Sequence, residues 1–402
     1  MTRRRTLVTV FRSERYSAIS LVAAAVLGLI VANSVAGPGL IDLTHAPLGV
    51  PGTHFELSVG HWVTDGLLAL FFFIVAVELR HELTRGELNS PTRALAPAVA
   101  AAAGVALPAL VYLLIAGSDF ARGWPIPVAT DIAFALGLIA LVGRGLPANI
   151  RVFLLALAVI DDLIAIVLIA VLFAHGFDVA SLVAAIGSVA LFYGVGCLRL
   201  TSRWTRTLRT LALVVLALAA WTATFSSGIH ATIAGVALGL VLRPSLAEKA
   251  AHALQPVVNA AILPLFAFVS SLVILPRGGL DALGPVFFAI AVALPVGKIV
   301  GITLGGWLVA CVTRPRRRSP AHHSGASGGV QGANLVTVSA VAGIGFTVSL
   351  LMNQLAFADS PALRDQGVLG VLAGSAVSIV VGGSLVAWRA RVARLRARHD
   401  AR

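Results

Sequence analysis

Two adjacent aspartates, Asp161 and Asp162, lie in the middle of an apolar run that covers residues 152–174. A helix rises about 1.5 Å per residue, so both carboxylates lie roughly 15 Å from either end of this run. In a bilayer whose hydrocarbon core is about 30 Å thick, that depth is the midplane. Acids at this depth are costly unless they face a partner or a water-filled cavity, so the pair is the first candidate for a functional site.

Similar apolar runs recur along the whole chain. The 402 residues are 58% hydrophobic and 12% charged, whereas a soluble protein carries about 25% charged residues. The sequence therefore predicts an all-α polytopic membrane protein that forms one membrane domain over residues 1–402, with about twelve spans. The expected spans are residues 16–34, 60–80, 94–116, 124–143, 150–174, 179–198, 207–224, 227–242, 254–274, 283–311, 331–355 and 367–388.

The basic residues indicate how the chain crosses the bilayer. Of the 30 lysines and arginines, all but Arg122, Arg277, Arg364 and Lys298 fall in alternate loops or in the two termini. The positive-inside rule places those loops and both termini in the cytoplasm. Because this topology explains the net charge of +13, we expect the lipid bilayer and no nucleic acid as a partner.

Four segments lie outside the expected spans. Residues 1–15 form a basic cytoplasmic N-terminus, and the apolar run that follows is interpreted as an uncleaved span because more spans come after it. Residues 35–59 form an external loop whose proline and glycine content favours a small hairpin. A flexible basic linker covers residues 313–330, and residues 389–402 form a basic cytoplasmic tail.

Two expected spans contain signals for a broken helix. The fourth span begins with Pro125 and Pro127, which remove backbone donors, and the eleventh contains Gly343 and Gly345 near its middle. Interrupted helices in corresponding positions of two halves are typical of transporters built from inverted repeats, here spans 3–5 and 10–12. The alternative is that the two glycines only allow close packing between helices.

Several further ionisable residues lie in or beside the spans. Lys298 needs a carboxylate partner or must lose its proton, and its candidate partners are Asp161, Asp162 and Asp131. Asp131 can neutralise the positive end of a half-helix in the fourth span, and Thr130 beside it offers a hydroxyl or carbonyl ligand.

Other charged residues lie toward the ends of the spans. Glu78 and Glu82 indicate a charged cytoplasmic mouth, although Glu82 is equally explained as a solvated residue. Asp65 is interpreted as a helix cap. His230 is either a pH sensor or a hydrogen-bonded structural histidine.

Seven motifs in order along the chain resemble the NhaA family of bacterial sodium/proton antiporters. They are FFFIVAVELR at 71–80, ATDIAFALG at 129–137, IDDL at 160–163, GIHAT at 228–232, LPLFAF at 263–268, PVGK at 295–298 and GIGFT at 343–347. The resemblance implies twelve helices, with crossing unwound segments in the fourth and eleventh. It also implies a multi-pass protein of the bacterial inner membrane that is not an enzyme and needs no cofactor.

The resemblance further implies how the polar residues work. Asp162 is the main Na⁺ ligand, with Asp161 and Thr130 beside it, and Asp161 pairs with Lys298 when sodium is absent. Asp131 and Lys298 balance the exposed half-helix ends. We thus expect electrogenic, pH-regulated exchange of cytoplasmic Na⁺ or Li⁺ for external H⁺, and a homodimer formed through residues 45–58.

One departure concerns the region that responds to pH in this family. Between the eighth and ninth expected spans, the chain has His252 but no carboxylate after Glu248. Glu78, Glu82, His230 and His252 are the candidates for pH response and ion access, but the pH set point does not follow from them.

Two other functions compete with antiport. One is a proton-coupled carrier of another solute, which only the family motifs argue against. The other is an intramembrane aspartate-dependent enzyme, for which Asp131 and Asp162 provide two acids on different helices. That enzyme class is the weaker alternative, because no Gly-x-Gly-Asp signature accompanies these acids.

Overall fold

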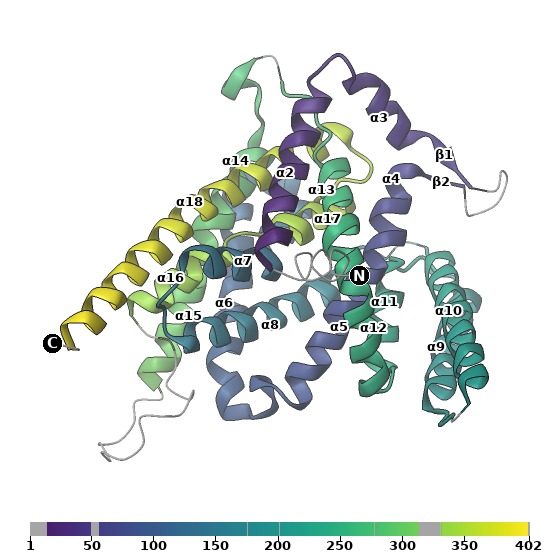
Figure 1. Ribbon diagram of the computed structural model, residues 1–402. Coiled ribbons are helices and arrows are strands. Elements are labelled where there is room, and N and C mark those ends of the chain that lie inside the picture. The colour runs from purple at the N-terminus through teal and green to yellow at the C-terminus, as the bar shows by residue number, and fades with distance from the viewer. Residues whose placement is uncertain are drawn as a thin grey trace, which may run out of the picture. The chain divides into compact units, whose positions relative to one another are not determined.

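The computed structural model describes residues 14–49, 56–174, 176–200, 202–276, 278–312, 330 and 332–400. Most of these residues lie in helices, which confirms the all-α prediction (Figure 1). The elements are α2 (Glu14–Ala32), α3 (Gly37–His45), β1 (Pro47–Leu48), β2 (Leu57–Ser58), α4 (Val59–His61), α5 (Leu68–Thr84), α6 (Pro91–Ala116), α7 (Ile132–Val142), α8 (Ala148–Leu172), α9 (Val179–Cys197), α10 (Arg203–Ser226), α11 (Thr232–Val241), α12 (Pro244–Val257), α13 (Leu263–Ser270), α14 (Pro285–Val292), α15 (Lys298–Val312), α16 (Ala333–Ala342), α17 (Phe346–Ala356) and α18 (Pro361–Asp400).

The helices confirm a multi-pass membrane protein. Among the described residues, eight helices are long and apolar enough to cross a membrane, and ten if each of two bent pairs counts as one span. The bent pairs are α2 with α3, at 110°, and α16 with α17, at 48°. The apolar segments Ile126–Val142 and Thr232–Val241 are shorter. The expected total of about twelve spans stays a prediction.

The contacts group the chain into two compact units, each made of segments that are far apart in sequence. The first unit includes Ser20–His81 and Ile166–Leu272. Within it, α9 and α10 lie side by side (Figure 1), and α11 packs closely on α5. A Cβ atom added to Gly235 would lie 2.1 Å from the carbonyl oxygen of Ala69, so the contact needs glycine.

The second unit comprises Ser13–Ile19, Glu82–Ala165 and Val273–Arg402. Its α6 packs along α14 and α15, and its α18 packs along α14, α16 and α17. Glycines permit the closest of these contacts, since a Cβ atom on Gly301 of α15 would lie 2.4 Å from the carbonyl oxygen of Ala103 on α6. The expectation of one domain over residues 1–402 stays a prediction.

Three spans contain a π-helical turn that the sequence pattern did not predict. These turns are Trp62–Leu67, Val258–Ile262 and Ala293–Gly297. In the last of them, Pro295 has no N–H to donate, which favours a local change of hydrogen-bond register. Such turns are often found at functional sites; here Ala293–Gly297 directly precedes Lys298, and Trp62–Leu67 contains Asp65.

The structure adds detail to the segments outside the spans. Residues 35–59 contain a helix, α3, with a proline in its first turn, a position that tolerates proline. The helix α18 continues through the basic residues after 389 to Asp400, and the expected segment boundaries stay predictions. The linker 313–330 and the basic residues 1–15 lie almost entirely outside the described residues.

The expected hairpin is present in part. Strands β1 and β2 pair antiparallel, with Pro47 opposite Ser58 and Leu48 opposite Leu57. The turn that joins them, residues 50–55, lies outside the described residues. The indole Nε1 of Trp62 donates to the carbonyl oxygen of Leu48 at 2.8 Å, which attaches this hairpin to the helix that follows it.

Candidate functional site

Two interrupted helices meet in the second unit. Before α7 the chain is extended at Ala129 and Asp131, and three residues, 343–345, separate α16 from α17. The backbone N–H of Asp131 donates to the carbonyl oxygen of Ile344 at 2.7 Å. The unwound segments are therefore bonded to each other through their backbones.

Gly343 and Gly345, which lie between α16 and α17, allow close packing as well as a break in the helix. Both have negative φ values, so a left-handed backbone does not explain them. A Cβ atom on Gly345 would lie 2.3 Å from Ser349 Oγ and 3.1 Å from the carbonyl oxygen of Ala129. The two interpretations of these glycines, a break and close packing, are thus both correct.

Asp131 caps two half-helices at once. Its Oδ1 accepts from the N–H of Phe134 at 3.0 Å, in the first turn of α7. Its Oδ2 accepts from the N–H and the hydroxyl of Thr347 at 3.2 Å and 2.7 Å, in the first turn of α17. Since a helix N-terminus carries partial positive charge, one buried carboxylate compensates two such ends.

Lys298 pairs with Asp161. Its Nζ lies 2.5 Å from Asp161 Oδ2, and both side chains are fully buried. Of the three candidate partners, Asp161 is therefore the one that makes the contact. The other oxygen, Asp161 Oδ1, is buried and has no hydrogen-bond partner among the described residues.

Thr130 connects this ion pair to the break in the eleventh span. Its hydroxyl lies 2.7 Å from Asp161 Oδ2 and 2.9 Å from the carbonyl oxygen of Ala342, which is the last residue of α16. A hydroxyl has one proton to donate. The two acceptors therefore compete for it, and the position of α16 influences how strongly Thr130 supports the carboxylate.

Asp162 follows Asp161 on α8 and is also buried. Consecutive helical residues point about 100° apart, so the two acids face different directions.

Ser349, which the sequence interpretation did not select, donates through its Oγ to the carbonyl oxygen of Ile126 at 2.7 Å. This bond joins α17 to the broken start of the fourth span. In the sequence, the feature that could have indicated this role is a serine two positions after the GIGFT motif.

The predicted pH-response residues lie on several elements. Glu78 is exposed on α5, and His252 is exposed on α12. Glu82 Oε2 accepts from the N–H of Glu87 at 3.1 Å, so it has a local structural partner. The guanidinium of Arg80, near Glu78, donates to the carbonyl oxygen of Leu240 at 2.8 Å and also to that of Leu242, at the end of α11.

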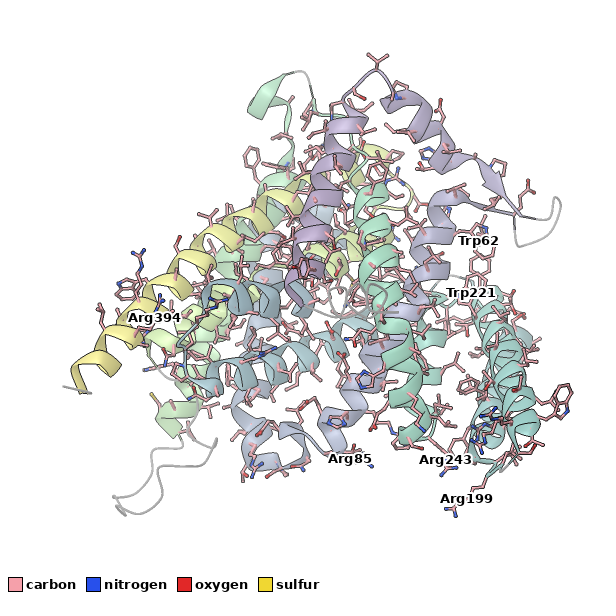
Figure 2. The ribbon with its side chains drawn as sticks, viewed as in Figure 1. Trp62, Arg85, Arg199, Trp221, Arg243 and Arg394 are labelled. Atoms are coloured by element: carbon pink, nitrogen blue, oxygen red, sulfur yellow. The ribbon has the colours of Figure 1, made fainter. Side chains whose placement is uncertain are left out.

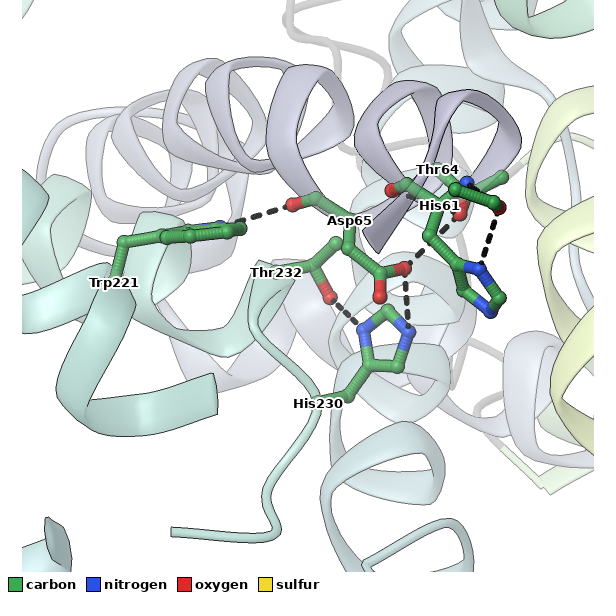
Figure 3. Close-up of polar contacts among 7 residues, drawn as sticks. His61, Thr64, Asp65, Trp221, His230 and Thr232 are labelled. Carbon is green, nitrogen blue, oxygen red and sulfur yellow. Dashed lines mark hydrogen bonds and ion pairs between the residues drawn. The ribbon is translucent and has the colours of Figure 1, made fainter. Parts of the chain in front are cut away.

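His230 has the most elaborate surroundings of these residues (Figure 3). Its Nε2 lies 3.2 Å from Asp65 Oδ1, with both side chains largely buried, and its Nδ1 lies 2.8 Å from Thr232 Oγ1. The interpretation of Asp65 as a helix cap was wrong: 165 positions separate it from its partner, and no local pattern indicates that contact. Trp221 donates to the carbonyl oxygen of Asp65 at 3.0 Å.

An aromatic stack adjoins this pair. Trp62 and Trp221 face each other with ring centroids 5.6 Å apart (Figure 2). Phe225 also stacks on Trp221, with ring centroids 5.9 Å apart. Offset aromatic pairs of this kind contribute about 0.5–1.5 kcal/mol beyond the area they bury. The stack therefore fixes the position of Asp65 through the Trp221 hydrogen bond.

Comparison with known proteins identifies the family. The family model described as Na⁺/H⁺ antiporter 1 matches residues 8–386. The chain belongs to this family. It is 55% identical to the Na⁺/H⁺ antiporter NhaA 2 of Clavibacter michiganensis subsp. michiganensis (strain NCPPB 382), over 96% of this chain and 93% of that protein. It is 42% identical to the Na⁺/H⁺ antiporter NhaA of Tropheryma whipplei (strain Twist), over 93% of this chain and 94% of that protein.

A third relative, the Na⁺/H⁺ antiporter NhaA of Streptomyces avermitilis (strain ATCC 31267 / DSM 46492 / JCM 5070 / NBRC 14893 / NCIMB 12804 / NRRL 8165 / MA-4680), is 40% identical over 94% of this chain and 80% of that protein. The resemblance inferred from the seven motifs is thereby confirmed. The family match covers all the polar residues described above, from Asp65 to Thr347.

Proposed function

We propose that this protein exchanges cytoplasmic Na⁺, or Li⁺, for external H⁺ across the bacterial inner membrane, with both termini in the cytoplasm. The observation that carries the proposal is the buried contact between Asp161 and Lys298, next to Asp162 and at the crossing of two broken helices. Family membership supports the identity of the two ions, since the relatives are named as Na⁺/H⁺ antiporters.

The available ligands suit sodium. Asp162, Asp161 and Thr130 supply carboxylate and hydroxyl oxygens, and the break at the end of α16 supplies carbonyl oxygens. Hard cations bind such oxygen donors. A protonated acid is a poor ligand, so H⁺ and Na⁺ exclude each other at Asp162.

Lys298 supplies the second part of the cycle. With no sodium present, its ammonium group balances Asp161. When Na⁺ binds at the aspartate pair, the cation takes over that charge balance, and the ammonium group is no longer needed as the partner of Asp161. One proton from Asp162 and a second from Asp161 or Lys298 then leave for each Na⁺ that enters, so the exchange moves net charge.

The crossing of the broken helices supports alternating access. Transporters of this architecture bind at the midplane and expose the site to one side at a time. If only the loaded states interconvert, movement of Na⁺ in one direction requires movement of H⁺ in the other. The hydrogen bonds of Asp131 to α7 and α17 keep the two half-helix starts together during this change.

We further propose that the exchange responds to pH and that the protein is a homodimer. His230 contributes to the pH response through its pair with Asp65, and Glu78, Glu82 and His252 contribute from α5 and α12. The antiparallel pairing of β1 with β2 supports residues 45–58 as the dimerising hairpin.

The decisive experiment uses the Asp162→Asn variant in everted membrane vesicles. We expect Na⁺ to dissipate the ΔpH of wild-type vesicles and to leave that of the variant unchanged. The matched control is Asp119→Asn, which makes the same change at an exposed acid and should keep wild-type exchange. Full exchange by a correctly inserted Asp162→Asn protein would contradict the assignment. Proteoliposome assays with Na⁺, Li⁺ and K⁺ separate sodium exchange from the carriage of another solute.

A further inference from the structure

One face of α18 supports the interrupted eleventh span along its whole length. Gly382 lies against the end of α16, where an added Cβ would be 3.1 Å from the backbone nitrogen of Val341. The N–H of Phe346, the first residue of α17, donates to Ser375 Oγ at 3.4 Å. These positions and Arg389 follow each other along α18 at intervals of seven, which places them on the same side of the helix.

Arg389 makes the contact at the start of α16. Its Nη2 and Nε donate to Oδ1 of Asn334 at 2.6 Å and 3.2 Å, so one guanidinium binds one acceptor through two donors. Asn334 is the second residue of α16, and the helix has no side-chain hydrogen bond at its own N-cap, Gly332. The Arg389 contact therefore ties the start of α16 to α18 through a side chain.

The other end of α16 reaches the ion site. Its last residue is Ala342, whose carbonyl oxygen accepts from Thr130, and the same hydroxyl lies within hydrogen-bond distance of Asp161. The ten residues of α16 form a rod about 15 Å long. A shift of one end of such a short helix displaces the other end, because its internal hydrogen bonds keep it rigid.

The same part of α18 also contacts the segment that leads into α8. Gly145 has φ +101°, and a Cβ atom there would lie 3.1 Å from Arg394 Cγ and 3.6 Å from the carbonyl oxygen of Ala390. Arg394 lies near the C-terminal end of α18 (Figure 2). The start of α16 and the segment that leads into α8 thus both rest on one basic helix end.

We propose that Arg389 is a positioning residue for cation binding. Through Asn334 it holds α16 in the register that keeps the Ala342 carbonyl, the Thr130 hydroxyl and Asp161 together. This inference rests on the proposed function, since its readout is the affinity for Na⁺.

If Arg389 acted only through its surface charge, its removal would change the apparent KM for Na⁺ in the opposite direction. The end of α18 is basic, and positive charge near the cytoplasmic mouth lowers the local concentration of Na⁺. An arginine substitution that acts only through the local Na⁺ concentration therefore lowers the apparent KM for Na⁺. A substitution that disturbs the position of α16 raises this KM, because the ligands are no longer held together. Arg391, which is exposed on the same helix, provides the matched control.

The experiment measures the Na⁺ dependence of exchange in proteoliposomes for Arg389→Gln, Asn334→Ala, the double variant and Arg391→Gln. We expect the first two to raise KM about three- to tenfold, which lies within the roughly 2- to 30-fold range for mutations that affect a distant site through packed elements. Vmax per folded protein should stay within about twofold. The double variant should match either single one, because both remove the same contact. Arg391→Gln should leave KM equal to or below the wild-type value.

Three results overturn the inference: an unchanged or lowered KM for Arg389→Gln, an equal rise for Arg391→Gln, or effects that multiply in the double variant. If Arg389→Gln does not accumulate, Arg389→Lys replaces it, since lysine keeps the charge but loses the planar two-donor contact. Wild-type protein without Na⁺-dependent exchange refutes the proposed function itself. Wild-type exchange combined with an unchanged KM for Arg389→Gln refutes only the role of Arg389.

Discussion

Replacement of Lys298 by methionine tests the buried ion pair without relying on transport. Methionine is close to lysine in length and leaves little cavity, so the main change is electrostatic. Asp161 keeps Thr130 as a donor but loses its counter-charge, and both side chains are fully buried. Removal of one partner of a buried pair typically costs about 3–5 kcal/mol, because the other charge stays desolvated.

This free energy corresponds to a measurable shift in melting temperature. With an unfolding entropy of about 2.1 cal/mol/K per residue, the 402 residues give about 0.8 kcal/mol/K. Lys298→Met should therefore melt about 4–6 °C below the wild type at alkaline pH.

The assay is thermal unfolding of detergent-purified protein, followed by the fluorescence of its six tryptophans at one scan rate. The control is Lys298→Met combined with Asp161→Asn, which removes both charges and should recover part of the lost stability. A Lys298→Met protein that melts with the wild type at alkaline pH would refute the reasoning. The reasoning would also be refuted if the double variant lost as much stability as the two single variants together.

Two further predictions concern the helices around the site. Asp131→Asn should lower stability by about 1–3 kcal/mol, since it weakens the caps of two half-helices; thermal unfolding measures this, and an unchanged melting temperature argues against the shared cap. Gly301→Val should destabilise the protein by more than about 2 kcal/mol, because the added Cβ would lie 2.4 Å from the carbonyl oxygen of Ala103. The control is Gly187→Val, where an added Cβ meets nothing within 4 Å; similar yields of folded protein from both variants would show that α6 and α15 are not so closely packed.

The sequence alone determined the class of the protein and predicted the depth of its acids. Apolar runs and their length are local properties, and the cost of a charge in hydrocarbon depends on depth rather than on neighbours. For the same reason the two interruptions were predictable, since prolines and paired glycines act on the backbone where they stand. The order of the seven motifs was sufficient to indicate the family, which the comparisons confirmed.

The tertiary structure decided which polar groups meet. Three acids were candidates for Lys298, and two of them are adjacent on one helix, where a rotation of about 100° separates their directions. Only the packing of α8 against the residues that follow the π-helical turn selects Asp161. Likewise, Asp131 caps α17 as well as α7, and Asp65 binds His230 rather than capping a helix. The partners in these contacts are 137, 216 and 165 positions apart, and no local pattern encodes how helices rotate against each other when they pack.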